Sequence, residues 1–174
     1  MRHVKVTGIA LLEVLISLVV ISVGLLGLAA LQVSSMQDTQ KTRYNEAASY
    51  GLAQLLDRMS SNGAGTQKNY YDFDNLSVAN KDKKPDDGCS DSSTSACVAK
   101  KELANWLEQT TAGLPDARVK ISATSVVSGA QVTAKIVWNA ALSSASATTD
   151  YTSVCDKTKV TSYQCSQITF WVRQ

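Results

Sequence analysis

The chain has little histidine and little proline, and each shortage excludes something. Its only histidine is His3, and its two prolines are Pro85 and Pro115. Histidine is the commonest general base and the commonest metal ligand, so its scarcity argues against a catalytic or zinc-binding role. Because no proline occurs in the first 84 residues, a long helix there meets no residue that must kink or end it.

The chain also lacks a large excess of charge of either sign. The chain carries 17 Lys and Arg against 15 Asp and Glu, a formal net charge of +2. The chain therefore lacks the excess of basic residues that would argue for nucleic acid as a partner. The mixed-charge run from Lys81 to Asp87 is typical of a solvated loop.

A long apolar run near the N-terminus dominates what is present. It extends from Thr7 to Leu31 and contains one charged residue, Glu13. The residues from Val14 to Leu31 carry no charge. As a helix, these roughly 18 residues would span about 27 Å, close to the thickness of a bilayer core. The run is therefore a candidate membrane-spanning helix.

The order of charge and hydrophobicity at the start of the chain differs from that of an ordinary secretory signal. Such a signal has its apolar region before the cleavage site and ends in small residues. Here Arg2, His3 and Lys5 come first, Gly8 follows, and the apolar residues from Ile9 onward come after it. We therefore expect cleavage after Gly8, which would leave the helix on the mature protein with Ile9 as its first residue. The mature chain would then carry balanced charges.

This arrangement resembles the class III signal of type IV pilins and type II secretion pseudopilins, in the residues Gly8-Ile9-Ala10-Leu11-Leu12-Glu13. The resemblance implies that a prepilin peptidase cuts after Gly8, that the new N-terminus at Ile9 is methylated, and that Glu13 serves in filament assembly. Ile9 stands where phenylalanine is usual in these families. The stretch from Val19 to Gln32 resembles more narrowly the PilV-type minor pilins.

Glu13 is expected to have a partner, because a carboxylate in a hydrocarbon environment costs about 2.5 to 3.5 kcal/mol on insertion scales. The amine that cleavage would create on Ile9 lies one helical turn away, on the same chain or on a neighbouring subunit. That amine is the natural counter-charge. The alternative is a glutamate near a helix end that reaches the lipid headgroups and has no further role.

The charges that flank the apolar run predict its orientation. Arg2 and Lys5 lie on its N-terminal side, whereas the charges that follow it are balanced, at Asp38, Lys41, Arg43 and Glu46. The positive-inside rule then places the leader in the cytoplasm and the rest of the chain in the periplasm, an oxidising compartment. By the resemblance, the protein is expected in the bacterial inner membrane with a single span, and in an assembled pilus at the cell surface.

Four cysteines lie in the part of the chain that would be exported, at Cys89, Cys97, Cys155 and Cys165. Four cysteines allow three pairings. We expect the two local bridges, Cys89 with Cys97 and Cys155 with Cys165, because each falls within or beside a polar loop; the other pairings stay open. A zinc site is disfavoured because the closely spaced Cys-x-x-Cys pattern is absent.

Hydrophobic periodicity predicts one helix from about Ile9 to about Ser60, with Gly63 suited to a left-handed C-cap. Gly24 and Gly27 are the residues of this helix with the weakest preference for helical structure. They favour either local unwinding or a close helix-packing face.

A polar connecting loop is expected over residues 63–96, followed by a short amphipathic helix over 98–110 with Trp106 in the core. The acids of the loop lack the regular spacing of a calcium site, and calcium binding there stays open: Asp72, Asp74, Asp86, Asp87 and Asp91.

Alternation of apolar and polar residues predicts strands over 119–124, 132–138 and 168–172, the first two joined as a hairpin. The fold expected is α+β with the layout of the type IV pilin fold, in which a long N-terminal helix packs on a small antiparallel sheet of about three or four strands.

Four segments are expected along the chain. Residues 1–8 form the leader, 9–31 the membrane or filament-core half of the helix, 32–62 its periplasmic half, and 63–174 a globular head with disulfide-tied loops.

The function expected is that of a minor pilin at or near the tip of a type IV pilus, where it helps prime assembly and supports adhesion, twitching motility or DNA uptake. The alternative is a minor pseudopilin of a type II secretion system. An enzyme is disfavoured because no catalytic constellation is present, and no cofactor or metal is expected. The resemblance implies four kinds of partner: the prepilin peptidase, other minor pilins, the major pilin and a tip adhesin.

Overall fold

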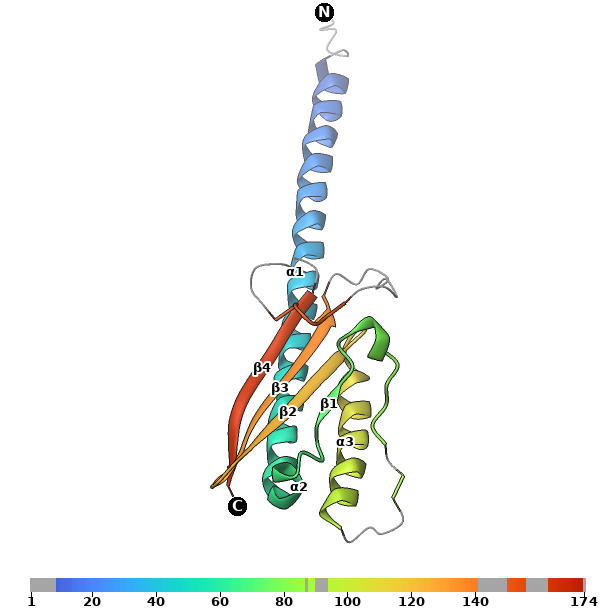
Figure 1. Cartoon of the computed structure of the whole chain (residues 1–174). Coiled ribbons are helices and arrows are strands. Elements are labelled where there is room, and N and C mark those ends of the chain that lie inside the picture. The colour runs from blue at the N-terminus through green and yellow to red at the C-terminus, as the bar shows by residue number, and fades with distance from the viewer. Residues whose placement is uncertain (1–8, 87, 90–93, 141–149, 156–162, 174) are drawn as a thin grey trace, which may run out of the picture. The chain divides into compact units, whose positions relative to one another are not determined.

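The computed structural model describes residues 9–86, 88–89, 94–140, 150–155 and 163–173. The chain divides into two compact units, one ending at Thr42 and the other beginning at Arg43. The elements are drawn in Figure 1 and follow one another as α1 (Ile9–Ser61), α2 (Gly63–Gln67), β1 (Phe73–Asp74), the 3-10 helix η1 (Val78–Asn80), α3 (Ser95–Thr111), β2 (Arg118–Val126), β3 (Gly129–Asn139) and β4 (Tyr163–Arg173).

The second unit contains a four-stranded antiparallel sheet in the order β1-β2-β3-β4. A two-residue turn joins β2 to β3, and Val126 pairs with Gly129 across it. Gly129 has a φ of 152°, and a Cβ there would collide with the carbonyl oxygen of Val172. Only glycine fits this position. The predicted hairpin and the predicted α+β class are both confirmed.

One face of the sheet is covered by the end of α1 and by α3; in Figure 1, α1 passes behind the strands and α3 lies to its right. The side chains that make this core recur at helical spacing on α1 and alternate along the strands, as the sequence predicts. They are Ala48, Leu52, Leu55 and Met59 from α1, Ala99, Leu103 and Trp106 from α3, and Val119, Ile121, Val132, Ala134, Ile136 and Trp138 from the sheet.

Helices α1 and α3 come close together at Gly51. The indole nitrogen of Trp106 donates a hydrogen bond to the carbonyl oxygen of Gly51 at 2.7 Å. A Cβ on residue 51 would lie 2.5 Å from Cγ2 of Thr110, a side chain that is itself buried. Glycine is therefore what allows the two helices to approach this closely.

Gly51→Ala is expected to lower the free energy of unfolding of the second unit by about 1 to 3 kcal/mol, because the new methyl group overpacks a rigid β-branched neighbour. The measurement is denaturation of the full chain in detergent, followed by circular dichroism. Thr110→Ala removes the obstructing methyl group, so the double variant should lose much less stability than Gly51→Ala alone. If Gly51→Ala lowered the free energy of unfolding equally in the original chain and in the Thr110→Ala variant, the packing explanation would be contradicted.

The opposite face of the sheet is partly covered by the chain itself. A second apolar cluster there contains Leu76, Val137, Tyr151 and Val154. Val137 is fully buried, although its place in the alternating pattern predicts that it faces water. The pattern is wrong at this position because residues 150–155, which carry no strand periodicity, fold over this end of β3.

Two further predictions about boundaries are corrected. Gly63 is not a left-handed cap: α1 ends at Ser61, and Gly63 begins α2 with Asn62 as its N-cap, whose side chain accepts from the Gly65 amide at 3.2 Å. The segment 63–96 is not only a loop, since it holds α2, η1 and the edge strand β1. These elements are too short to show a hydrophobic period.

Candidate membrane-spanning and assembly segment

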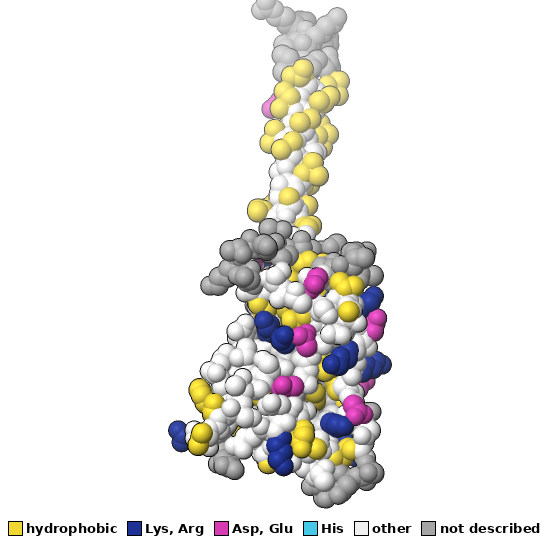
Figure 2. All heavy atoms as spheres, in the orientation of Figure 1, with side chains coloured by type: hydrophobic (Ala, Val, Ile, Leu, Met, Phe, Trp, Pro, Cys, Tyr) yellow, Lys and Arg dark blue, Asp and Glu magenta, His cyan; other side chains and the backbone are white. Residues whose placement is uncertain are grey.

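The first part of α1 is apolar on all sides. By length and composition, α1 is one helix able to cross a membrane, and its most apolar window has a mean hydropathy of 2.8. None of that window is buried within the structure. Figure 2 shows the hydrophobic side chains on the surface along this part of the helix. A helix that is apolar all round is suited to lipid or to a bundle of similar helices.

Glu13 is the charged side chain within this apolar stretch. Its backbone carbonyl accepts a hydrogen bond from the Ser17 hydroxyl at 2.7 Å. Its carboxylate is exposed and has no hydrogen-bond or ion-pair partner among the residues that the structure describes. The chain therefore offers an acid on an apolar surface without supplying the counter-charge from its described part.

The residues assigned to processing lie at the edge of what is described. Gly8 falls outside the described residues, and Ile9 is the first residue of α1. Glu13 follows Ile9 by four residues, which is about one turn of helix. Cleavage after Gly8, methylation of Ile9 and the assembly role of Glu13 stay predictions.

Helix α1 continues unbroken through Gly24 and Gly27. A Cβ at either position would meet no atom within 4 Å of it, leaving aside the helix's own nearby backbone. Neither glycine is therefore required by packing against the part of the chain that the structure describes. The local unwinding that was one expectation is not present in the described helix.

Both expected disulfides are present, joining Cys89 to Cys97 and Cys155 to Cys165. The first ties the end of the polar segment to the first turn of α3. The second ties residues 150–155 to β4 and packs against the second apolar cluster. Each bridge thus fastens an irregular segment to a regular element of the second unit.

Non-reducing peptide mapping should recover these two local bridges. Each closes a short loop, with sequence separations of 8 and 10. On the chain-entropy account each bridge should contribute about 2.5 to 3 kcal/mol, so reduction should lower the thermal midpoint of the second unit measurably. Recovery of Cys89 linked to Cys155 or Cys165 would contradict the pairing.

A buried arginine fastens the same end of the sheet. The Arg118 guanidinium lies 4.0 Å from the centre of the Tyr151 ring and donates to the carbonyl oxygen of Leu76 at 3.2 Å. The Tyr151 hydroxyl donates to the Asp116 carboxylate. Burial, and then this hydrogen bond, raise the pKa of Tyr151 well above its usual range. The buried ring, its hydrogen bond to Asp116 and the Arg118 guanidinium together hold residues 150–155 on the sheet.

The three candidate acids of the polar segment that the structure describes are engaged with cations or backbone amides. Lys100 donates to Asp86 at 2.6 Å, Lys120 pairs with Asp74 at 2.7 Å, and Asp72 accepts from the backbone amide of Ala123 at 2.8 Å. Several interactions lower the pKa of Asp86, and the hydrogen bond from Lys100 has the largest effect.

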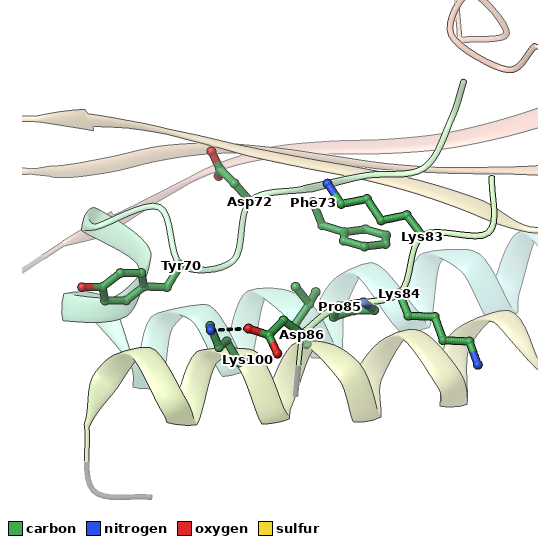
Figure 3. Close-up of a pocket in the computed structure, with 9 residues that line it drawn as sticks. Tyr70, Asp72, Phe73, Lys83, Lys84, Pro85, Asp86 and Lys100 are labelled. Atoms are coloured by element: carbon green, nitrogen blue, oxygen red, sulfur yellow. Dashed lines mark hydrogen bonds and ion pairs between the residues drawn. The ribbon is translucent and has the colours of Figure 1, made fainter. Parts of the chain in front are cut away.

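A shallow hollow of about 230 Å³ lies between this segment and α3. Figure 3 shows Asp86 and Lys100 pointing toward each other, whereas Asp72 and Lys84 point away from them, so the two acids do not face one centre. Within the described part of the chain, no group of three or more histidines, cysteines or acids is placed to hold a metal ion. Asp87 and Asp91 lie outside the described residues.

No protein-family model, no curated protein and no solved structure matches this chain. The architecture itself is pilin-like: a long N-terminal apolar helix whose end packs on a four-stranded antiparallel sheet, with two disulfides. The apolar helix and the disulfides indicate a membrane anchor with an extracytoplasmic domain.

Proposed function

We propose that the chain is a minor pilin of the PilV type, incorporated at or near the tip of a type IV pilus, where it helps prime assembly. The single observation that carries the proposal is Glu13, an acid with no described partner on the first part of α1, which is otherwise uncharged and mostly apolar. Such a group in lipid calls for a counter-charge. A neighbouring subunit processed at Ile9 would provide one as its terminal amine.

The pathway that follows has three steps. The precursor is held in the inner membrane by α1 with its head in the periplasm. A prepilin peptidase cuts after Gly8, and the new terminus at Ile9 is methylated. The helix then leaves the bilayer for a bundle of pilin helices, formed with other minor pilins and the major pilin. A tip adhesin is a further candidate partner, and adhesion, twitching motility and DNA uptake are the candidate outputs.

The second candidate is a minor pseudopilin of a type II secretion system. The leader, Glu13 and α1 would serve that role equally well. The stretch from Gly24 to Leu31 and the two disulfides favour the pilus. In neither case is the protein proposed to be an enzyme, because Asp72, Asp74 and Asp86 are paired with a cation or a backbone amide and the chain's only histidine is His3 in the expected leader.

Cross-linking in intact cells, followed by mass spectrometry of the membrane-extracted protein and of sheared filaments, tests the proposal. The expected result is cross-links from the α1 segment to other pilin helices, with the chain present in the filament fraction. Cross-links confined to secretion-system components, with none of the chain in filaments, would contradict the pilus and favour the second candidate.

A further inference from the structure

The outer face of the sheet is the face turned away from α1 and α3. Its composition follows from the register, because directly opposed residues on neighbouring strands point to the same side. Two adjacent rows carry only uncharged side chains, and we name these six residues the neutral face: Thr124, Gln131 and Trp171 in one row, and Ser122, Thr133 and Thr169 in the next.

The neutral face has defined borders. On one side lies a row with Lys120 and Lys135, and beyond it the second apolar cluster covers the sheet. On the other side lie Arg173 and the exposed turn residue Val127. Figure 2 shows a mostly white surface, neither hydrophobic nor charged, over the middle of the sheet, with hydrophobic and basic side chains at its hairpin end. Among the residues that the structure describes, the chain thus covers one end of this face and leaves the neutral face open.

Trp171 is the distinctive side chain of the neutral face. It is 60% exposed, whereas Trp106 and Trp138 are fully buried in the core. Its indole N–H has no hydrogen-bond partner among the described residues. A large aromatic ring left in water on a strand keeps apolar area available for a ligand, and its N–H keeps a donor available.

The side chains around Trp171 are hydroxyls and amides. Gln131 lies directly opposite it on β3, and the hydroxyl oxygens of Thr133 and Thr169 lie 3.3 Å apart in the adjacent row. Hydroxyl and carboxamide groups both donate and accept hydrogen bonds. None of the six residues carries a carboxylate, an ammonium or a guanidinium group, although the Asp72 carboxylate borders the second row, where it accepts from the backbone amide of Ala123 at 2.8 Å.

We propose that the neutral face binds an uncharged polysaccharide. A sugar ring has a C–H face that packs against an aromatic ring and hydroxyl groups that both donate and accept, which are the two kinds of group that Trp171 and its neighbours complement. An anionic polymer would find no counter-charge within the two rows. A stable protein partner would need a broader apolar centre than Trp171 with the exposed valines Val126 and Val127 at the border of the face. The proposal goes beyond assembly and does not depend on it.

The test uses the full chain in a detergent without a sugar headgroup, because glucosides and maltosides would compete for the site. Neutral oligosaccharides of glucose, mannose, galactose and N-acetylglucosamine are titrated by calorimetry and by tryptophan fluorescence. At least one series should bind saturably and change the emission of Trp171. Raising the salt from about 0.05 M to about 0.5 M should leave the affinity unchanged, since no ion pair is formed.

Trp171→Ala should weaken calorimetric binding about tenfold or more, and Trp171→Tyr should restore part of it, because tyrosine keeps an aromatic face. Tyr50→Ala is the matched control, since Tyr50 is an exposed aromatic residue on α1 rather than on the sheet, and it should bind as the unchanged chain does. Circular dichroism of each variant reports that the fold is retained.

Three results would overturn the proposal. The first is the absence of binding across the whole panel, and the second is unchanged binding by Trp171→Ala. The third is a preference for a single-stranded oligonucleotide that weakens steeply with salt, which would assign this surface to phosphate through Lys120, Lys135 and Arg173.

Discussion

Glu13→Ala is expected to leave the chain inserted in the membrane, stable and largely processed, yet to reduce its recovery in filaments or partner complexes at least about tenfold. Removing the acid makes insertion easier, because a carboxylate in hydrocarbon costs about 2.5 to 3.5 kcal/mol. The same change removes the attraction to a neighbouring subunit's terminal amine. The free-energy cost of breaking a buried charge pair is greater than the ~1.4 kcal/mol that corresponds to a tenfold change in an equilibrium constant.

The experiment measures membrane level, cleavage and recovery in sheared filaments side by side. Glu13→Asp keeps the charge and should recover part of the assembly, whereas Glu13→Gln should behave like alanine. Ser17→Ala is a matched control one turn further along α1, because the Ser17 hydroxyl is already bonded to a carbonyl of its own helix. Normal filament recovery with Glu13→Ala would mean that the assembly role must be withdrawn.

Replacing Gly8 with a bulky residue should abolish processing and leave the chain as an uncut precursor in the membrane. The expectation follows from position, because Gly8 is the only glycine before the apolar run. An immunoblot should show one band of higher mass, and recovery in filaments should fall to background. This loss is larger than that expected for Glu13→Ala, because without cleavage the amine at Ile9 never forms.

The control for Gly8 is Gly24→Ala, a glycine that lies within α1 and not at the proposed cleavage site. A Cβ there would meet no atom within 4 Å in the described structure, so processing should be normal. Efficient maturation of the Gly8 variant would show that the leader is removed at another site.

The sequence predicts the fold well wherever a hydrophobic period extends over several turns or residues. The long helix, the amphipathic helix around Trp106 and the three long strands all lie where periodicity indicates, and the bounds differ by a few residues. Helix α3, for example, begins at Ser95 because the Thr94 side chain accepts from the Cys97 amide. A single capping hydrogen bond leaves a weaker signal in sequence than a repeated apolar face.

The sequence does not predict features that depend on contacts between distant segments. Burial of Val137 needs Tyr151 and Arg118, and the two residues of β1 are held by pairing with β2 rather than by their own propensity. The close approach of Gly51 to Thr110 likewise joins two helices far apart in sequence. Such features are decided by tertiary packing, which a local pattern does not contain.

The candidate assembly site can be predicted from the sequence more readily than these tertiary contacts, because nearly all of it lies in one contiguous segment. Glu13 stands out in the sequence as an acid in an apolar run, and the structure adds that its carboxylate has no partner among the described residues. Trp171 is the residue that sequence reasoning missed. Its exposure follows from the register of β4, which places Val172 and Phe170 in the core and Trp171 on the outer face.

The most direct test of the central claim is the intact mass and N-terminal peptide of the protein recovered from sheared filaments. The account predicts a chain that begins at Ile9, carries a methyl group on its terminal amine and retains Glu13 four residues further on. A chain that begins after Leu31, or one found only as uncut precursor outside filaments, would contradict the claim that this protein is a processed filament subunit.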